Sequence, residues 1–427
     1  MGHRQGSLED VGGVVKPDTL ACRHCGTPLR HSFCDLGSSP LANSYLSEQQ
    51  LKEVERFFPL HVYVCEECFL VQLPEAETAS NIFSDYAYFS SYSESWLEHA
   101  EAYVNAMVPR FGLDASKQVI EIASNDGYLL QFFARKGVPV LGIEPAANVA
   151  AAAVEKGIPT RVQFFGTKTA QELESSGTGA DLLLGNNVLA HVPDLNDFVR
   201  GMKIVLKPSG VITMEFPHLL RLMEENQFDT IYHEHFSYFS FLTVERVFAH
   251  HGLRIFDVDQ IPTHGGSLRI YAAHGDDPAK QPTDRVRALK AEEIAAGLGG
   301  LDAYRSFDEK VKRTKRALLT FLIQAKNEGK RIVGYGAPAK GNTLLNYCGV
   351  RSDFLDFTVD RSPHKQGKYL PGVRIPIHDV EAVRAAKPDF VLILPWNLKD
   401  EIAQQMAYVR EWGGRFVVPI PEVSVLK

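Results

Sequence analysis

The stretch QVIEIASNDGYLLQFFARKGVPVLGIEP, residues 118–145, determines the fold class. It opens with a short apolar run containing β-branched residues, passes into a helical pattern, and ends in a second apolar run. The alternation continues to about residue 275, with helices at AANVAAAAVEKG and LNDFVRGMKIVL and strands at DLLLGNN, GVITMEF, LRIFDV and GGSLRIYAA. Strands that alternate with helices are typical of a doubly wound, mostly parallel sheet. We therefore predict an α/β fold whose central sheet ends in an antiparallel hairpin.

The turn after the first strand has the composition of a ligand site. In a doubly wound sheet, ligands lie beyond the carboxyl ends of the strands, where the strand order reverses. Gly127 allows the backbone to approach a ligand closely, and Glu144 ends the second strand, where a carboxylate can accept both hydroxyls of a ribose. We predict that a cofactor contacts Glu121, Ala123, Asn125, Asp126, Gly127, Glu144, Asn186 and Asn187.

The identity of this cofactor is indicated by the glycines that are missing. The dinucleotide fingerprint needs G-x-G-x-x-G and an acid about 20 residues further on; the acid is present, but two of the three glycines are not. A pyrophosphate requires that glycine-lined helix start, whereas S-adenosylmethionine carries no phosphate. The pattern resembles motif I of class I methyltransferases, with Glu144 in their ribose-binding position, and this resemblance implies S-adenosylmethionine. A purely structural strand–turn–helix is the alternative.

Four of the six cysteines fall in two identical pairs, Cys22-x-x-Cys25 and Cys65-x-x-Cys68. Four soft thiolates can close a tetrahedron around Zn²⁺ and leave no open position. Repeated C-x-x-C spacing in a chain of cytosolic type favours metal binding over disulfides. We predict a structural zinc site, with unpaired buried thiols as the alternative. Cys34 and Cys348 are expected to be packing residues.

Length and composition set the broad class of the protein. A chain of 427 residues exceeds the size of one ordinary domain. The formal net charge of −7 argues against a nucleic-acid partner, which would require a basic surface. No apolar run approaches the length needed to cross a bilayer, and the first residues contain no apolar signal region. We expect a soluble, cytoplasmic protein without a membrane partner.

A second α/β unit follows the central one. It begins with a long amphipathic helix at residues 308–329 and continues with the strand RIVGYGA, a helix at AKGNTLLNYCG and the strands FTVD and FVLIL. In GYGAPAKG, residues 334–341, backbone amides at a helix start and one lysine would suit a diphosphate. The basic loop at residues 360–368 could also hold phosphate or could simply be solvated. We predict domains at residues 1–78, 79–285 and 286–427.

The stretch TIYHEHFSYFS, residues 230–240, surrounds two histidines and a glutamate with aromatic residues. A metal site, a base in an aromatic pocket and an ordinary polar loop are the three interpretations. The metal interpretation is the weakest, because the helical H-E-x-x-H spacing is absent. His191 lies just beyond the tip of the fourth strand, where polar side chains are more often functional than on a helix face.

The ordered set of motifs resembles the sugar C-methyltransferases of deoxysugar biosynthesis, a setting that includes antibiotic pathways. The paired C-x-x-C turns, EIASNDG, NNVLAHVPD, YHEH, HGGSLRIY and GYGAPAKG occur in the order of that family, and the resemblance covers essentially the whole chain. These enzymes act on nucleotide-linked 4-keto-6-deoxyhexoses. The resemblance implies a zinc-binding, an S-adenosylmethionine-binding and a C-terminal Rossmann-like domain. The last would hold the diphosphate of the nucleotide sugar through Gly336, Ala337, Lys340 and Gly341.

The resemblance also implies the catalytic residues. The family's Tyr-x-Glu-His falls on Tyr232, Glu234 and His235, its strand-tip histidine on His191, and its tyrosine ahead of the sheet on Tyr86, with Tyr88 as the alternative. His233 has no family counterpart and no assigned role. Imidazole titrates near neutral pH, so His235 suits the base that removes a proton beside the ketone. Tyr232, His191 or Tyr86 would donate hydrogen bonds to the enolate, and Glu234 would orient an imidazole or bind a sugar hydroxyl.

Three alternatives remain at this level. Methylation at C3 is favoured and C5 is possible, because the same machinery serves either carbon beside the ketone. An O- or N-methyltransferase would keep the cofactor motif but needs no enolate pocket. A zinc-containing nucleic-acid-binding protein would keep the cysteines. A monomer is compatible with the sequence.

Overall fold

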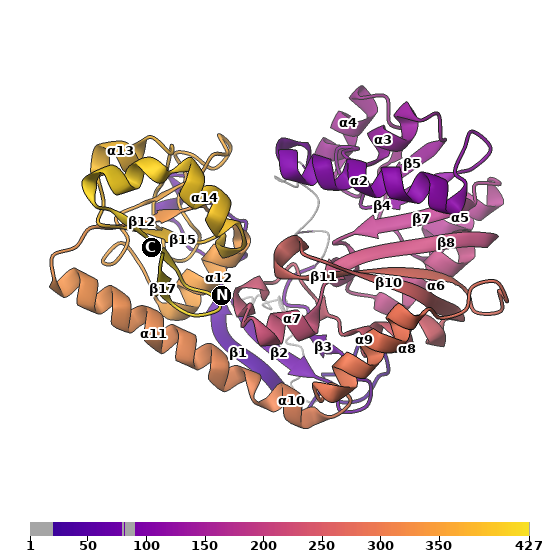
Figure 1. Cartoon of the computed structure of the whole chain (residues 1–427), viewed down its shortest axis with the longest axis horizontal. Helices are drawn as coiled ribbons and strands as arrows, with labels where there is room; N and C mark the ends of the chain where they lie inside the picture. The colour runs from indigo at the N-terminus through magenta and orange to yellow at the C-terminus, as the bar shows by residue number, and fades with distance from the viewer. Residues whose placement is uncertain (1–19, 79–80, 82–89, 427) are drawn as a thin grey trace, which may run out of the picture.

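The computed structural model describes residues 20–78, 81 and 90–426. Over these residues the chain forms three sheets, which Figure 1 shows as two larger units joined at their base by the N-terminal strands. No helix in the described part of the chain is long and apolar enough to span a membrane.

The central sheet has the order β10-β11-β8-β7-β4-β5-β6. Five strands are parallel: β4 (Val119–Ile122), β5 (Val140–Ile143), β6 (Thr160–Arg161), β7 (Ala180–Asn186) and β8 (Leu206–Pro217). The hairpin of β10 (Leu253–Ile261) and β11 (Ser267–His274) is antiparallel and joins the sheet at β8. The predicted doubly wound sheet with its terminal hairpin is confirmed.

Helices cover both faces of the central sheet because its strands are apolar on both sides. On one face Val119 packs with residues of α2 (Glu94–Phe111), α3 (Leu130–Arg135) and α4 (Ala147–Glu155). On the other face Ile120, the next residue, packs with residues of α5 (Thr167–Ser175), α6 (Leu195–Val205) and α8 (Phe241–His250). Figure 1 shows α2, α3 and α4 together on one side of the sheet. The carboxyl ends of the parallel strands β7, β4 and β5 lie side by side at one edge of this sheet.

The C-terminal sheet has the order β14-β13-β12-β15-β16-β17. Its parallel strands are β12 (Ile332–Tyr335), β13 (Thr358–Val359), β14 (Ile377–His378), β15 (Phe390–Ile393) and β16 (Arg415–Val418), and β17 (Ser424–Val425) is antiparallel. The long helix α11 (Phe307–Asn327) precedes the sheet, α12 (Ala339–Cys348) follows β12, and α13 (Ala382–Ala386) and α14 (Lys399–Gln405) lie on the outside. The second α/β unit was therefore predicted correctly, although β14, β16 and β17 were not recognised.

The N-terminal sheet is completed by a strand from the middle of the chain. β1 (His31–Ser39), β2 (Phe58–Val64) and β3 (Val71–Gln72) form an antiparallel sheet whose fourth strand is β9 (Ser237–Tyr238). Val71 pairs with Tyr238 and Gln72 with Ser237. The loop that contains the two histidines and the glutamate thus leads directly into the sheet of the cysteine segment.

The N-terminal sheet shares its core with the C-terminal unit. Phe33 of β1 stacks on Phe307 at the start of α11, with ring centroids 4.7 Å apart. Leu60 and Val62 of β2 belong to the same apolar cluster as Leu344 of α12 and as residues of α7 (Leu219–Glu224). The linking helices α9 (Asp284–Ala295) and α10 (Leu301–Arg305) complete the base of the molecule. The predicted domain boundaries stay a prediction, and α9 begins beside the boundary placed at residue 285.

Candidate active site and metal centre

The four paired cysteines lie together at the edge of the N-terminal sheet. Their sulfur atoms all lie within 4.8 Å of one another. The Sγ atoms of Cys22 and Cys68 are 3.5 Å apart, and those of Cys25 and Cys65 are also 3.5 Å apart. Tetrahedral zinc with Zn–S bonds of about 2.3 Å places its sulfur ligands about 3.8 Å apart. The cluster therefore fits zinc.

Hydrogen bonds around the cysteines fix the position of the cluster. The Gln72 side chain donates to Cys22 Sγ over 3.1 Å and accepts from the Arg23 backbone N–H over 2.9 Å. Thr243 of α8 donates to the Cys68 carbonyl over 3.1 Å. Because Gln72 also pairs with β9, the metal centre is tied to the strand that follows the YHEH loop. Outer partners of this kind orient the ligands of metal sites.

The turn after β4 has an unusual backbone. Ala123, Asn125 and Gly127 adopt left-handed conformations, with φ of 56°, 50° and 74°. A Cβ atom on Gly127 would lie 3.0 Å from Ile158 Cγ1, so no larger residue fits without movement. Strained backbone of this kind is concentrated at ligand sites.

Buried acids line the ends of β4 and β5. Glu144 accepts hydrogen bonds from the backbone N–H groups of Asn125 and Ala146, each at 2.9 Å. Glu121 is completely buried, and its burial raises the pKa of this carboxyl well above the ordinary value, as do the neighbouring Glu144 and Asp126, while a hydrogen bond from Tyr128 lowers it. A neutral or ligand-bound carboxyl is favoured at such a site.

Two residues of the turns have polar atoms that a ligand could satisfy. The Oδ1 atom of Asp126 and both polar side-chain atoms of Asn186 are buried and have no hydrogen-bond partner within the described residues. Buried polar groups are normally paired, so such atoms indicate an absent partner. Because β7, β4 and β5 are neighbours, these groups lie along one edge of the sheet. They fit the amino-acid and ribose portions of S-adenosylmethionine, which offer donors and hydroxyls.

The structure brings three of the predicted catalytic residues together. The rings of Tyr232 and His235 have centroids 4.1 Å apart, and those of His191 and His235 are 4.7 Å apart. Phe236 N–H donates to the Ala190 carbonyl over 2.7 Å and so fastens the YHEH loop to the turn after β7.

His235 is held in one tautomer. Its Nδ1 lies 2.8 Å from the Thr230 carbonyl oxygen. Since a carbonyl only accepts, Nδ1 carries the proton and Nε2 keeps a lone pair. Burial lowers the pKa of His235 to about 4, and the charge of Lys340 acts in the same direction. Burial likewise lowers the pKa of His191 well below its usual value. Both rings are therefore neutral at pH 7.

The two remaining members of the YHEH stretch contact the N-terminal segment. Glu234 Oε1 accepts a hydrogen bond from Asn43 Nδ2 over 2.6 Å. His233 Nε2 lies 3.2 Å from the Pro59 carbonyl oxygen, its ring meets Phe58 edge-on, and the residue is only 3% exposed. His233 therefore fastens the loop to β2. Tyr86 and Tyr88 lie outside the described residues.

The turn at residues 334–341 is already engaged by side chains of this chain. The Ala337 N–H donates to Asp360 Oδ2 over 2.7 Å, and the Ala337 carbonyl accepts from Tyr45 and Lys365. Added Cβ atoms would lie 2.6 Å from Pro395 Cδ at Gly336 and 3.0 Å from Leu394 Cβ at Gly341. The Ala337 amide is thus occupied, and Lys365 supports the turn.

Lys340 lies in the first turn of α12, and its charge acts on His235 of the central unit. Its Nζ donates to Asn397 over 2.8 Å and lies 4.4 Å from the ring centroid of Trp396. Burial lowers the pKa of Lys340, while the carboxylate of Asp229 opposes that effect.

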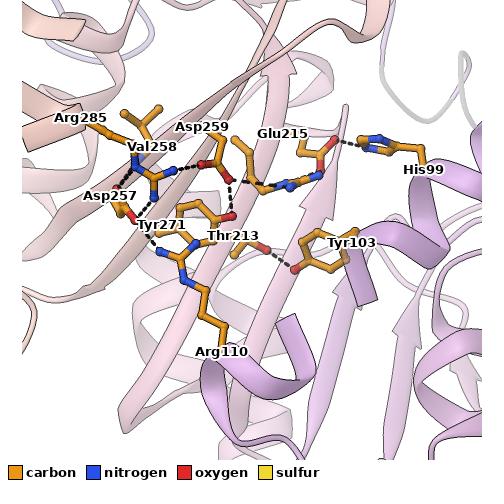
Figure 2. Close-up of polar contacts among 11 residues, drawn as sticks. His99, Tyr103, Arg110, Thr213, Glu215, Asp257, Val258, Asp259, Tyr271 and Arg285 are labelled. Atoms are coloured by element: carbon orange, nitrogen blue, oxygen red, sulfur yellow. Dashed lines mark hydrogen bonds and ion pairs between the residues drawn. The ribbon is translucent and has the colours of Figure 1, made fainter. Parts of the chain in front are cut away.

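Sequence reasoning missed a polar network on α2 and the terminal hairpin. Figure 2 shows His99 reaching Glu215 at the carboxyl end of β8, with Tyr103 bonded to Thr213. Arg269 donates to the other oxygen of Glu215 over 2.6 Å. Burial alone would raise the pKa of Glu215, but His99 and Arg269 lower it below the ordinary value. The network continues through Asp259, Tyr271, Arg285, Asp257 and Arg110.

A second missed group lies beside the cofactor turn. Asn187, with φ of 55° at the end of β7, donates to His264 Nε2 over 3.1 Å. His264 also has a positive φ, 57°, and meets the edge of Trp96 with ring centroids 5.4 Å apart. His99 stacks on the same indole at 4.9 Å. Asn187 was predicted to contact the cofactor, whereas the histidine of the quoted HGGSLRIY motif was not assigned a role.

Three family models match the chain. A zinc binding domain matches residues 22–83, a methyltransferase domain residues 96–258, and a C-methyltransferase C-terminal domain residues 262–421. Among curated proteins, the C-methyltransferase NovU of Streptomyces niveus is 37% identical over 414 residues, which cover 97% of this chain and 98% of that protein.

More distant similarities involve smaller parts of the chain. A ubiquinone biosynthesis O-methyltransferase of Bartonella tribocorum is 29% identical over 96 residues, 22% of this chain and 39% of that protein. The crystal structure of magnesium protoporphyrin IX methyltransferase from Synechocystis PCC 6803 covers 42% of this chain and 79% of its own, with 15% identity and a TM-score of 0.33. Likenesses this distant add nothing to the assignment. The full-length relative and the C-methyltransferase model decide it, and the chain belongs to the S-adenosylmethionine-dependent C-methyltransferases with an N-terminal zinc-binding domain.

Proposed function

We propose that this enzyme methylates a ring carbon beside the ketone of a nucleotide-linked 4-keto-6-deoxyhexose. C3 is the favoured carbon and C5 is the alternative. The observation that carries the proposal is the single tautomer of His235, whose Nδ1–H is bound to Thr230 and whose Nε2 is left as a proton acceptor. Methylation of an oxygen or a nitrogen would not require donors for an enolate, whereas Tyr232 and His191 lie beside this base as two potential donors.

His235 acts as the base in the proposed reaction. A proton leaves the carbon beside the ketone and passes to Nε2, and the electron pair moves into the enolate. The low pKa of His235 keeps the free enzyme in the basic form but makes the imidazole a weak acceptor. The enolate compensates, because it places a negative charge beside the imidazolium that forms. The Thr230 carbonyl stabilises the same imidazolium by accepting its Nδ1–H.

Tyr232, His191 and Tyr86 are the proposed donors to the enolate oxygen. Donors fixed before the reaction stabilise developing charge without reorganisation, and the loss of one typically costs about 10²–10³ in kcat. Glu234 is held by Asn43 and is assigned to a sugar hydroxyl. When bound, S-adenosylmethionine supplies the electrophilic methyl group. We assign its ribose to Glu144 and its amino-acid portion to the turns that contain Glu121, Ala123, Asn125, Asp126, Gly127, Asn186 and Asn187.

The C-terminal unit is assigned to the nucleotide diphosphate. Lys340 supplies the positive charge. Gly336 and Ala337 set the turn before α12, whose first backbone amides follow, and Gly341 lies in the first turn of that helix. The Ala337 amide already donates to Asp360 and is not assigned to the diphosphate. Ala337 instead helps to shape the turn. Lys340 then faces both the diphosphate and the reacting sugar.

Product analysis tests the proposal. The enzyme, S-adenosylmethionine and a panel of nucleotide-linked 4-keto-6-deoxyhexoses are incubated, and the products are examined by mass spectrometry and NMR. We expect a mass gain of one methylene with a new C–CH₃ signal on C3. An O–CH₃ or N–CH₃ product, or turnover only of substrates without a ketone, would reject the proposal.

A further inference from the structure

Trp396 contacts three separate segments of the chain, through Lys340, Gly265 and Asp229. It follows β15 and begins the short helix η6 (Trp396–Leu398). Its indole lies under the ammonium group of Lys340, 4.4 Å from the ring centroid, and a Cβ atom on Gly265 would lie only 2.8 Å from its Cη2. Its Nε1–H donates to Asp229 Oδ2 over 2.7 Å. With 7% exposure, the indole is packed on nearly every side.

Asp229 connects this indole to the proposed base. It is completely buried in the short helix η4 (Phe228–Thr230), and the next residue, Thr230, supplies the carbonyl that accepts the His235 Nδ1–H over 2.8 Å. The path from Trp396 to the imidazole therefore contains two hydrogen bonds and one peptide step. A buried carboxylate is costly to keep unless it is hydrogen-bonded, and the Trp396 N–H is the donor that Asp229 has from the C-terminal unit.

The charges around the indole reinforce this connection. Burial raises the pKa of Asp229 to about 6, while the charge of Lys340 and the Trp396 hydrogen bond oppose that rise. Asp229 and Lys340 thus interact electrostatically, and the indole contacts both. A second contact between the same segments is the hydrogen bond from Thr343 of α12 to the Ile231 carbonyl, at 2.9 Å.

We propose that Trp396 and Asp229 are a pair of positioning residues, which hold the turn that orients His235 against the C-terminal unit that carries Lys340. The inference rests on the proposed function, because it assigns His235 to the base and Lys340 to the nucleotide sugar. Both members of the pair are buried, and neither is assigned a contact with the substrate. Their bond fixes the relative position of the base and the substrate-binding lysine, which lie on different sheets.

The first test removes one hydrogen-bond donor and keeps an aromatic side chain packed at position 396. Trp396→Phe keeps an aromatic ring but cannot donate to Asp229. Trp412→Phe is the matched control, because Trp412 Nε1 donates to the Pro388 carbonyl over 3.0 Å in the same unit, away from the proposed site. A misplacement of about 1 Å costs on the order of 100-fold in rate. We therefore expect Trp396→Phe to lower kcat by about 10- to 100-fold, with Trp412→Phe near wild type.

Further measurements separate positioning from general support of the fold. Exchange of the substrate proton in D₂O should fall in parallel with kcat, while S-adenosylmethionine binding in calorimetry and KM change by less than about threefold. Asp229→Leu removes the acceptor from the other side, and its kcat should match that of Trp396→Phe. The double variant should be no slower than either single one, because coupled residues are not additive. Asp229→Asn, which retains an acceptor oxygen, should recover part of the loss.

The outcomes distinguish this inference from the proposal on which it rests. If His235→Asn stops proton exchange but Trp396→Phe and Asp229→Leu retain wild-type kcat and exchange, the positioning pair is rejected and the base stands. If Trp396→Phe and Asp229→Leu each lower kcat but the two effects add independently in the double variant, the positioning pair is rejected as well. An active His235→Asn enzyme overturns both statements. Should Trp396→Phe not fold, Asp229→Leu and Asp229→Asn decide the question by the same readouts.

Discussion

At the scale of single residues, the YHEH loop gives its two histidines, which flank Glu234, different surroundings. His233 is buried against β2, whereas His235 packs on Tyr232 and His191. The chain turns between them, because the His235 N–H donates to the Tyr232 carbonyl over 2.9 Å. The extra histidine that sequence reasoning left without a role is thus a contact to the N-terminal sheet.

Replacement of the two histidines should give opposite results. His235→Asn should lower turnover by about two to four orders of magnitude, the usual contribution of a general base, with unchanged S-adenosylmethionine binding. His233→Asn should lower the free energy of unfolding by about 1 kcal/mol through its lost hydrogen bond, with kcat near wild type. Stopped-time assays and D₂O exchange measure the first effect, and denaturant unfolding measures the second. Near wild-type turnover of His235→Asn would move the base to His191 or Tyr86.

The pH dependence follows from the lowered pKa of His235, about 4 against an ordinary 6.5. The free enzyme keeps the basic form until the pH falls through the folded-state pKa, so the acid limb of kcat/KM should lie near pH 4. The free energy of unfolding should also fall as the pH falls from 6.5 toward 4. In this range the unfolded chain binds the proton of His235 and the folded chain does not. Rate profiles, with circular dichroism as the check of folding, measure both. An acid limb at 6.5 in folded enzyme would contradict the assignment.

Glu144 provides the residue-level test of the cofactor site. Glu144→Ala should weaken S-adenosylmethionine binding by about 1.5–3 kcal/mol, the scale of hydrogen bonds to a charged group. The turn it supports would also loosen, because its oxygens accept from Asn125 and Ala146. Glu155→Ala on the exposed end of α4 is the control and should leave the affinity unchanged. Calorimetry measures the difference, and tight binding by Glu144→Ala would exclude this ribose assignment.

At the scale of elements, the predictable parts were those with local signals. The strand–helix alternation from residue 118 and the paired cysteines could be found because strand ends and C-x-x-C turns are short-range patterns. The pairing of β3 with β9 could not, because Val71 and Tyr238 are far apart in sequence and two-residue strands have no periodicity. Asp229 and Trp396 were missed for the same reason: 167 positions separate them.

The polar network of Figure 2 holds β8, β11 and α2 together around one buried carboxylate. Arg269→Met should lower the free energy of unfolding by about 3–5 kcal/mol, because it leaves Glu215, 1% exposed, without its guanidinium partner. Arg287→Met removes an exposed i,i+3 pair with Asp284 and should cost less than about 1 kcal/mol. Urea unfolding compares the two. Equal small effects would show that Glu215 does not need the arginine.

At the scale of the whole molecule, the N-terminal sheet connects both larger units. Its core is shared with α11 and α12, its fourth strand comes from the central unit, and its metal centre lies at that junction. Residues of the N-terminal segment therefore belong to the apolar cores of both larger units.

Zinc should accordingly stabilise more than the cysteine segment. Purified enzyme should contain about one zinc per chain, and Cys22→Ser should lower the unfolding temperature of the whole enzyme, because metal-binding free energy is folding free energy. Cys34→Ser, at a buried cysteine outside the cluster, is the control and should retain the metal. Metal analysis with calorimetric unfolding provides the measurement. A zinc-free wild type, or a histidine-bound metal, would refute the prediction.

The shared core has a consequence for enzyme engineering. A chimaera that borrows the C-terminal unit of a relative, in order to accept another nucleotide sugar, would place foreign α11 and α12 against native β1 and β2. Phe33 and Phe307 stack across that seam, so the two surfaces must be inherited together. The exchangeable module is therefore discontinuous: residues of the first two strands have to travel with the last third of the chain, and a single crossover point cannot deliver both.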